Sequence, residues 1–223
     1  MSQLEHELKS LRDEVIDMWN LVHSQLLKAL SALLNSDKDL AREIVMIEKR
    51  VNGAELKIDR DCEDIFALYC PVAIDLRFLL AVLKINTNLE RIGDIAEGIA
   101  KLIIDSERPF QEELFEATKI IEMFHESEQM IQQILTAFVQ EDSSIARGIF
   151  GRDELLDDIN RRANDLIIDY LEKYPQDIHQ ALSVLSIIRR LERVGDQAEN
   201  IAEEIIFYIE AKVLKHTNKR IQE

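Results

Sequence analysis

Apolar residues recur at three- and four-residue spacing along nearly the whole chain, which is the pattern of amphipathic helices. The first segment carries this pattern at Leu4, Leu8, Leu11, Val15, Met18, Val22, Leu26 and Leu30. It ends at the polar cluster 35–37, where Ser36 or Asp37 can cap the helix that follows. The pattern therefore predicts one long helix that ends near residue 35.

The few turn-forming residues divide the rest of the chain. Only 6 Gly and 3 Pro occur among the 223 residues, so few and long helices are expected. The breaks fall at Pro71, in the segment 106–109, at the cap candidates Asp142 and Ser143, and at Pro175. The predicted helices run from about 39 to 69, 71 to 104, 112 to 139, 143 to 174 and 176 to beyond 208. The polar tail after Leu214 is expected to fray.

One segment of the sequence is repeated. A hexapeptide occurs as Leu89-Glu90-Arg91-Ile92-Gly93-Asp94 and again as Leu191-Glu192-Arg193-Val194-Gly195-Asp196. Over residues 89–100 and their counterparts, nine of twelve residues are identical. A polar stripe upstream also recurs, pairing Glu48, Asn52, Glu55 and Asp59 with Asp153, Asp157, Asn160 and Asn164. The repeat predicts an all-α fold of two pseudo-symmetric three-helix bundles, formed by residues 1–107 and 108–223.

Carboxylates follow one face of the repeated helix. At about 100° per residue, Glu90, Asp94 and Glu97 share a face opposite the isoleucines, and we expect a solvent-side acidic ridge there. The second copy predicts the same ridge at Glu192, Asp196, Glu199 and Glu203. If the neighbouring antiparallel helix packs alongside, its polar stripe meets this ridge across a groove.

Clustered carboxylates without sulfur or imidazole are suited to hard or borderline cations such as magnesium, manganese or iron, bound as one or several ions. The candidate ligands are Glu48, Asn52, Glu90, Asp94, Glu97, Asp153, Asp157, Glu192, Asp196 and Glu199. The alternative is a solvated acidic helix face. Duplication of the acidic segments at equivalent places favours the metal interpretation.

Charge limits the classes of partner. The 43 acidic and 27 basic residues give a net charge of -16, which repels nucleic acid and favours a partner with a basic surface. The first residues lack the layout of a secretion signal, and no apolar run approaches membrane-spanning length. We therefore expect a cytoplasmic protein that meets the membrane only through its partners. Cys62 and Cys70 are expected to be reduced and buried.

Known catalytic patterns are missing from the sequence. It contains no phosphate-binding loop, dinucleotide glycine fingerprint or nucleophile elbow, and Glu122 to His125 is the single Glu-x-x-His pair, where a di-iron bundle needs two. We therefore do not expect an enzyme. A metal-dependent enzyme of phosphoryl chemistry and a metal-free helical scaffold stay as alternatives.

The segment from Pro71 through Asp75, Leu76 and Arg77 to the repeated hexapeptide resembles the signature of the PhoU family of phosphate-uptake regulators, and so does the second copy. The helix before it is also similar to the family, at Val51, Asn52, Glu55, Ile58, Asp59 and Cys62. The resemblance spans nearly the whole chain.

That resemblance implies metal ions at the acidic motifs and a role in restraining phosphate uptake and phosphate-starvation signalling. It implies two partners, the ATPase of a phosphate ABC transporter and a phosphate-sensing histidine kinase. The sequence leaves a homodimer open. Asn52 departs from the pattern because Asp157 stands in the other copy, so the two sites are expected to differ. The counterpart of Asp75-Leu76-Arg77, near His179 and Gln180, is weak.

Overall fold

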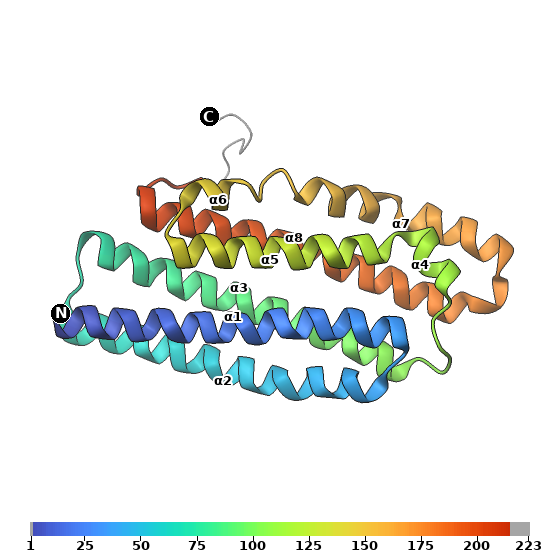
Figure 1. Ribbon diagram of the computed structural model, residues 1–223, viewed down its shortest axis with the longest axis horizontal. Helices are drawn as coiled ribbons and strands as arrows, with labels where there is room; N and C mark the ends of the chain where they lie inside the picture. Colours follow the sequence, from blue (N-terminus) through green and yellow to red (C-terminus); the bar gives the residue numbers. More distant parts are fainter. Residues whose placement is uncertain (1, 215–223) are drawn as a thin grey trace.

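The computed structural model describes residues 2–214, which form helices and connecting turns (Figure 1). The elements are α1 (Gln3–Asn35), α2 (Lys38–Tyr69), α3 (Ala73–Asp105), α4 (Glu112–Thr118), α5 (Ile120–Gln140), α6 (Ser143–Arg147), α7 (Asp153–Lys173), the 3-10 turn η1 (Pro175–Asp177) and α8 (Ile178–Glu210). The part of the chain described here contains no strand. The all-α prediction is confirmed, and the predicted tail after Leu214 lies outside the described residues.

Local capping explains where the first helices begin and end. The Ser2 hydroxyl accepts from the backbone N–H of Glu5, whose carboxylate accepts from the Ser2 N–H, so α1 begins with a capping box. Ser36 ends α1 in the left-handed conformation, and the Asp37 carboxylate caps α2. The predicted boundaries near residues 35 and 69 are confirmed.

The predicted fourth helix is interrupted. Lys119 adopts the left-handed conformation with φ 57°, and it separates α4 from α5. The buried positions explain this break, because Thr118 and Ile120 are both buried although they lie only two residues apart. A continuous helix would turn one of them about 200° away from the other. The single helix expected from 112 to 139 was therefore wrong at this point.

The predicted fifth helix is interrupted as well. After α6, residues 148–152 form turns before α7 begins at Asp153. Gly148 and Gly151 lie within this segment, and glycine in a helix interior costs about 1 kcal/mol relative to Ala. Ile149 and Phe150 between them are buried, so the interrupted chain turns both side chains into the core. The single helix expected from 143 to 174 was therefore wrong over residues 148–152, while the segments on either side of them are helical.

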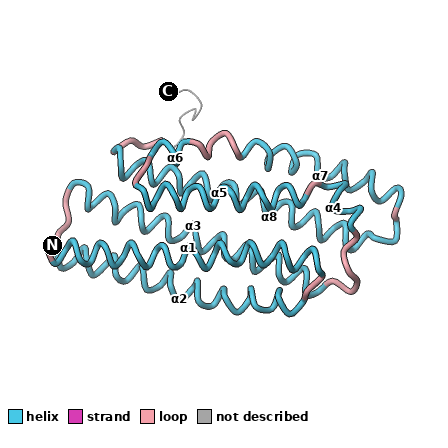
Figure 2. The backbone as a smooth tube through the Cα atoms, viewed as in Figure 1, coloured by secondary structure: helices cyan, strands magenta, loops and turns pink. Residues whose placement is uncertain are grey.

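The helices form two bundles that lie side by side (Figures 1 and 2). The first contains α1, α2 and α3, and the second contains α4 to α8. The bundles meet where α3 packs on α8 and α1 packs on α5, while α2 and α7 lie at opposite outer edges. The two groups of three long helices confirm the predicted duplicated architecture.

The buried positions of the two bundles match at a fixed offset. Each buried residue of α5, from Ile120 to Phe138, lies 105 residues after a buried residue of α1. From Gln180 to Ala202, each buried residue of α8 lies 102 residues after a buried residue of α3, with Gly93 and Gly195 both buried. The repeat is therefore present in the packing of two of the three pairs of long helices, including the first helix of each bundle, where sequence identity gave little signal.

Polar contacts join the bundles across the apolar core. The indole N–H of Trp19 donates to the carbonyl oxygen of Ile131 at 3.2 Å, and both residues are buried. Lys84 pairs at 2.9 Å with Glu204, which is 4% exposed.

None of the helices among the described residues is long and apolar enough to cross a membrane.

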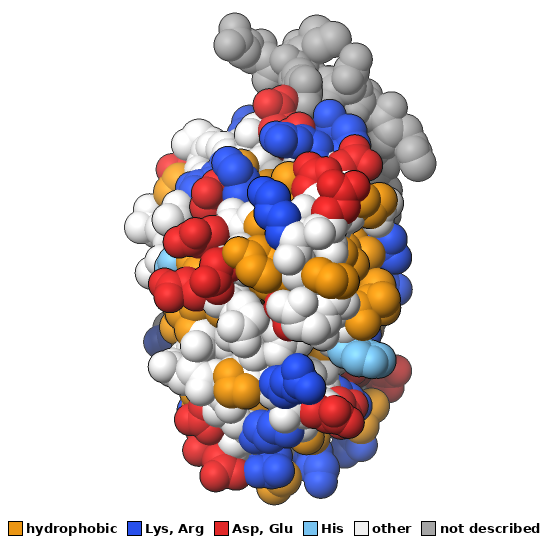
Figure 3. All heavy atoms as spheres, turned by 90° about the vertical axis from the view of Figure 1, so that its right-hand side faces the viewer, with side chains coloured by type: hydrophobic (Ala, Val, Ile, Leu, Met, Phe, Trp, Pro, Cys, Tyr) orange, Lys and Arg blue, Asp and Glu red, His pale blue; other side chains and the backbone are white. Residues whose placement is uncertain are grey.

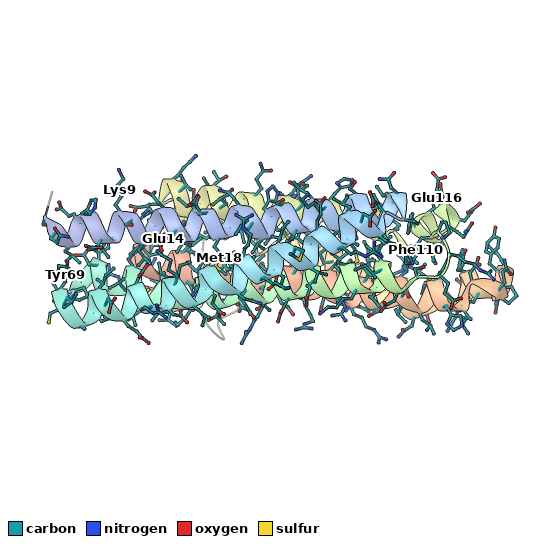
Figure 4. The ribbon with its side chains drawn as sticks, turned by 90° about the horizontal axis from the view of Figure 1, so that it is seen from below. Lys9, Glu14, Met18, Tyr69, Phe110 and Glu116 are labelled. Carbon is teal, nitrogen blue, oxygen red and sulfur yellow. The ribbon has the colours of Figure 1, made fainter. Side chains whose placement is uncertain are left out.

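The connections between the long helices of the first bundle lie toward the two ends of the long axis, while the turns at residues 148–152 lie partway along it (Figure 1). Tyr69 and Lys9 lie toward one end, and Phe110 and Glu116 lie toward the other (Figure 4). At the latter end the N–H of Phe110 donates to the hydroxyl of Ser36 at 3.2 Å, which ties the inter-bundle connection to the end of α1.

The expectation of two buried cysteines was half wrong. Cys62 is buried, but Cys70 is exposed because it ends α2 in a left-handed turn.

Candidate functional site

Glu48 of α2 is buried in the groove between α2 and α3. Its side chain is only 2% exposed. The amide of Gln25, on α1, donates to the Oε2 atom of Glu48 at 2.8 Å. The other oxygen, Oε1, is buried without a hydrogen-bond partner. A buried carboxylate oxygen with no partner is costly in an apolar interior, and it is an open acceptor for a donor or a cation.

Gly93 of α3 provides the space for this carboxylate. A Cβ atom at that position would lie 2.6 Å from the Oε2 atom of Glu48 and 3.2 Å from Val51. Any larger residue at 93 would displace the Glu48 side chain or separate the two helices. The repeated helix-interior glycine is therefore explained by close approach of a charged side chain, and not by backbone conformation.

Neighbouring acids act on Glu48. The pKa of Glu48 is raised to about 7, first by burial and then by the carboxylates of Asp94, Glu97 and Glu90. The hydrogen bond from Gln25 opposes that rise. Burial is also the largest cause of the raised pKa values of Glu90 and Glu55. Asp94 and Glu55 raise the pKa of Glu90 as well. Asp59 and Asp94 raise that of Glu55. The predicted meeting of the α2 stripe with the α3 ridge is thus visible in their electrostatic coupling.

Asn86 extends the polar groove along α3. Its amide donates to the Oδ1 atom of Asp59 at 2.9 Å and to the backbone carbonyl of Glu55 at 3.0 Å. The side-chain oxygen of Asn86 is itself buried without a partner. Neither Asn86 nor Gln25 was among the predicted site residues, because neither lies in the polar stripe or the acidic ridge that the sequence repeats.

Asp153 occupies the corresponding place in the second bundle. A Cβ atom at Gly195 would lie 2.2 Å from the Oδ1 atom of Asp153, so the glycine again makes room for a carboxylate. That Oδ1 atom is buried without a hydrogen-bond partner. The pKa of Asp153 is raised to about 7, first by burial and then by four acids: Glu199, Asp157, Asp196 and Glu192. Carboxylate and glycine have therefore been duplicated as a pair.

The two copies differ in the residues around this pair. At the offset that relates α1 to α5, Gln25 is matched by Met130, which supplies no amide to Asp153. Asn52 is exposed and forms no hydrogen bond within residues 2–214, while Asp157 adds a carboxylate that raises the pKa of Asp153. Glu203, expected on the solvent ridge, is instead buried at 6% exposure, because α8 packs on its neighbours over this turn.

The donor chemistry of both grooves fits an oxygen-preferring cation. Each groove has a buried carboxylate oxygen without a hydrogen-bond partner and several further acids close enough to raise its pKa. The side chains do not form a ready ligand shell, since no group of three or more His, Cys, Asp or Glu residues in the described chain is placed to hold an ion. Glu97 for instance pairs with Lys101 at 2.5 Å. Side-chain rotation is needed before these acids share a cation.

Comparison with known protein families identifies the family of this chain. The model of the PhoU domain matches residues 15–103 and again residues 120–205, one match in each bundle. The chain belongs to the PhoU family. The matched ranges include Glu48 with Gly93 in the first copy and Asp153 with Gly195 in the second.

PhoU relatives match nearly the full chain. The phosphate-specific transport system accessory proteins PhoU of Escherichia coli K12 and Edwardsiella tarda are 31% and 32% identical to it, each over 214 residues. These alignments cover 96% of this chain and 88% and 87% of the relatives.

PhoU structures confirm the fold. The crystal structure of PhoU from Pseudomonas aeruginosa superposes with a TM-score of 0.88 at 30% identity, covering 94% of this chain and all of that one. The phosphate transport system regulatory protein PhoU from Streptococcus pneumoniae superposes with a TM-score of 0.84, also at 30% identity. It covers 95% of this chain and 99% of that one.

Proposed function

We propose that this protein is a regulatory accessory protein of phosphate transport, which restrains phosphate uptake and phosphate-starvation signalling. The observation that carries this proposal is membership of the PhoU family over both bundles, with relatives named as accessory proteins of the phosphate-specific transport system. The partners we propose are the ATPase of a phosphate ABC transporter and a phosphate-sensing histidine kinase. The protein then reaches the membrane through these partners.

The two carboxylate grooves are proposed to bind cations. In the first bundle Glu48, Glu90, Asp94 and Glu97 would hold the ion, with Asn52 beside them. In the second bundle the proposed ligands are Asp153, Asp157, Glu192, Asp196 and Glu199. The buried oxygens that lack a hydrogen-bond partner support this assignment. A bound magnesium, manganese or iron ion would neutralise the mutual repulsion of the acids and fix the spacing of the paired helices.

Charge supports a protein partner with a basic surface. The net charge of -16 would steer association with such a surface and make the rate depend on salt. The bound cations would lower the negative charge of both outer faces, because the grooves lie between α2 and α3 and between α7 and α8. Metal loading is therefore proposed to set which partner surface the protein accepts.

Gene deletion in the source organism tests the regulatory role. Uptake of radiolabelled phosphate in phosphate-rich medium should rise when the gene is deleted and return when the intact gene is restored. Unchanged uptake and unchanged expression of phosphate-starvation genes in the deletion strain would contradict the proposal.

A variant separates the cation sites from the fold. Asp94→Asn with Asp196→Asn removes one exposed carboxylate from each groove and keeps the size of both side chains. If the cations act in regulation, this double variant should fail to restrict uptake. The matched control is Asp13→Asn with Asp17→Asn, which removes the same charge from exposed positions of α1 and should restrict uptake normally. Equal behaviour of the two double variants would contradict a role for the grooves.

A further inference from the structure

Two patches of exposed apolar side chains lie at the starts of α3 and α8. The first apolar patch consists of Val72, Leu76 and Leu80, and the second apolar patch consists of Tyr174, Ile178 and Leu182. Their exposed fractions lie between 37% and 71%. Within each patch the last two residues are four apart on one helix, so they share one face of it. Figure 3 faces the end of the molecule where α8 begins, and hydrophobic side chains lie open there among acidic and basic ones.

Both patches belong to the repeat. At the offset of 102 residues that relates α3 to α8, each member of the first patch matches one member of the second. The outer helices behave differently at their offset of 105 residues, since Leu56 of α2 matches Arg161 and Ile168 of α7 matches Glu63. Single exposed apolar residues need no explanation, but here the same three positions are apolar and exposed in both copies. The apolar surface of α3 and α8 is therefore duplicated together with the fold.

Both patches lie on one face of the molecule. α1 packs on α3, α5 packs on α8, and α1 and α5 pack on each other, so the exposed sides of α3 and α8 face away from α1 and α5 (Figure 1). We call this surface the α3/α8 face. Asp94 and Asp196, which belong to the two carboxylate grooves, are exposed on the same two helices.

The axis that exchanges the two bundles passes between α3 and α8. These helices are antiparallel, because Lys84 pairs with Glu204 while the guanidinium of Arg190 lies against Gly98. Position 78, midway between Leu76 and Leu80, therefore lies beside the end of α8 at 210. From 210 back to position 180, in the second patch, α8 extends about 45 Å at 1.5 Å per residue.

This separation is too large for one compact contact. A standard interface covers about 800 Å² on each partner, which corresponds to a disc about 30 Å across. Two separate contacts are needed to cover both patches. They are equivalent contacts, because the axis between α3 and α8 relates one patch to the other.

Charge and symmetry indicate what covers the α3/α8 face. A second copy of the chain would bring another net charge of -16 against it, which opposes association. A partner with a two-fold axis presents the same surface twice, and an ABC transporter carries two ATPase subunits related in this way. We propose that the α3/α8 face docks across both ATPase subunits of the phosphate transporter, with one apolar patch on each subunit. This arrangement rests on the ATPase being the partner, as proposed above, and it places one chain on each transporter.

Native mass spectrometry of the purified transporter in detergent, mixed with the full chain and manganese, measures the stoichiometry. One chain per transporter is expected at saturation. Two chains per transporter would overturn the inference and leave the ATPase as a partner. A parent chain that does not bind would contradict the proposed partner, and the inference would fail with it.

Paired variants locate the contacts. Leu76→Ser with Leu80→Ser alters the first patch, and Ile178→Ser with Leu182→Ser alters the second. Each double variant should weaken binding about tenfold or more, and by similar factors, because losing either contact removes the gain from bivalent attachment. The four substitutions together should abolish binding at the concentrations at which the parent is saturated.

Leu27→Ser with Val139→Ser is the matched control. These residues are exposed apolar positions of α1 and α5, outside the α3/α8 face, and the variant should bind as the parent does. A loss confined to one patch, or an equal loss in the control, would overturn the inference. Sedimentation of the chain alone tests the remaining occupant, since a dimer that the patch variants dissociate would assign the face to a second copy instead.

Discussion

Replacing Glu48 with Gln gives a direct measure of the cost of the buried carboxylate. Glutamine has nearly the same shape as a protonated glutamate, so the variant mimics the neutral form at every pH. The Gln25 amide can still donate to the side-chain oxygen at position 48. The difference between variant and parent should therefore report ionisation of Glu48 more than any change of packing.

The expected size follows from the pKa of Glu48, which rises from 4.5 to about 7 in the folded protein. A folded state that holds the proton more tightly is most stable below the unfolded pKa, and it loses that stability as pH rises through the folded pKa. The displacement corresponds to at most about 3 kcal/mol at pH 8. The quantity to compare is the free energy of unfolding of the variant minus that of the parent. In chelator, this difference should favour the variant by about 1–3 kcal/mol more at pH 8 than at pH 5.

Urea denaturation at pH 5 and pH 8 measures this difference, and the melting temperature should follow by about 2–4 °C per kcal/mol. Glu116→Gln is the control, because Glu116 is exposed and forms no ion pair in the described chain. Its difference from the parent should be the same at both pH values. If Glu48→Gln behaves like Glu116→Gln, or loses stability between pH 5 and pH 8, the buried carboxylate is not the strained group inferred here.

Further outcomes follow from the packing. Gly93→Ala and Gly195→Ala should each destabilise the metal-free protein by about 1–3 kcal/mol in urea denaturation, since the new methyl group would clash with a carboxylate. Gly53→Ala, in a helix interior with nothing within 4 Å of the new Cβ, should stabilise by about 0.5–1 kcal/mol, and equal effects at all three glycines would contradict the steric account. Lys84→Met should cost about 1–3 kcal/mol, because Glu204 is buried at the bundle interface, and a change near zero would mean that the pair contributes nothing. Binding to the transporter ATPase should weaken as salt rises, and an affinity independent of salt would indicate a mainly apolar interface.

Helix boundaries could be predicted where capping residues or a proline next to the boundary determine them. The caps at Ser36 and Asp37 and the stop before Pro71 depend on neighbouring residues only. The break at Lys119 was not predictable in this way. Ile120 and Ile121 are both apolar, so the periodic pattern continues in either phase and only tertiary packing decides which isoleucine is buried.

The acidic residues of the candidate site could be predicted from the sequence, but the residue that donates to them and the depth of their burial could not. Repetition of the hexapeptide identified Asp94 and Asp196 together with their glycines, because the same residues recur at the same helical spacing. Gln25 could not be found in this way, since it comes from a third helix and has no counterpart of its kind in the second bundle. The burial of Glu48 was equally hidden, because a flank position on a helix says nothing about the depth of the groove.

Metal binding to the purified chain is the most direct test of the central claim that the duplicated carboxylate grooves bind cations. Calorimetric titration of metal-free protein with manganese should show binding, and the melting temperature should rise once the metal concentration passes the dissociation constant. Asp94→Asn with Asp196→Asn should lose most of this response and be slightly more stable without metal, because like charges are relieved. A double variant that responds as the parent does, or that is less stable without metal, would contradict the claim.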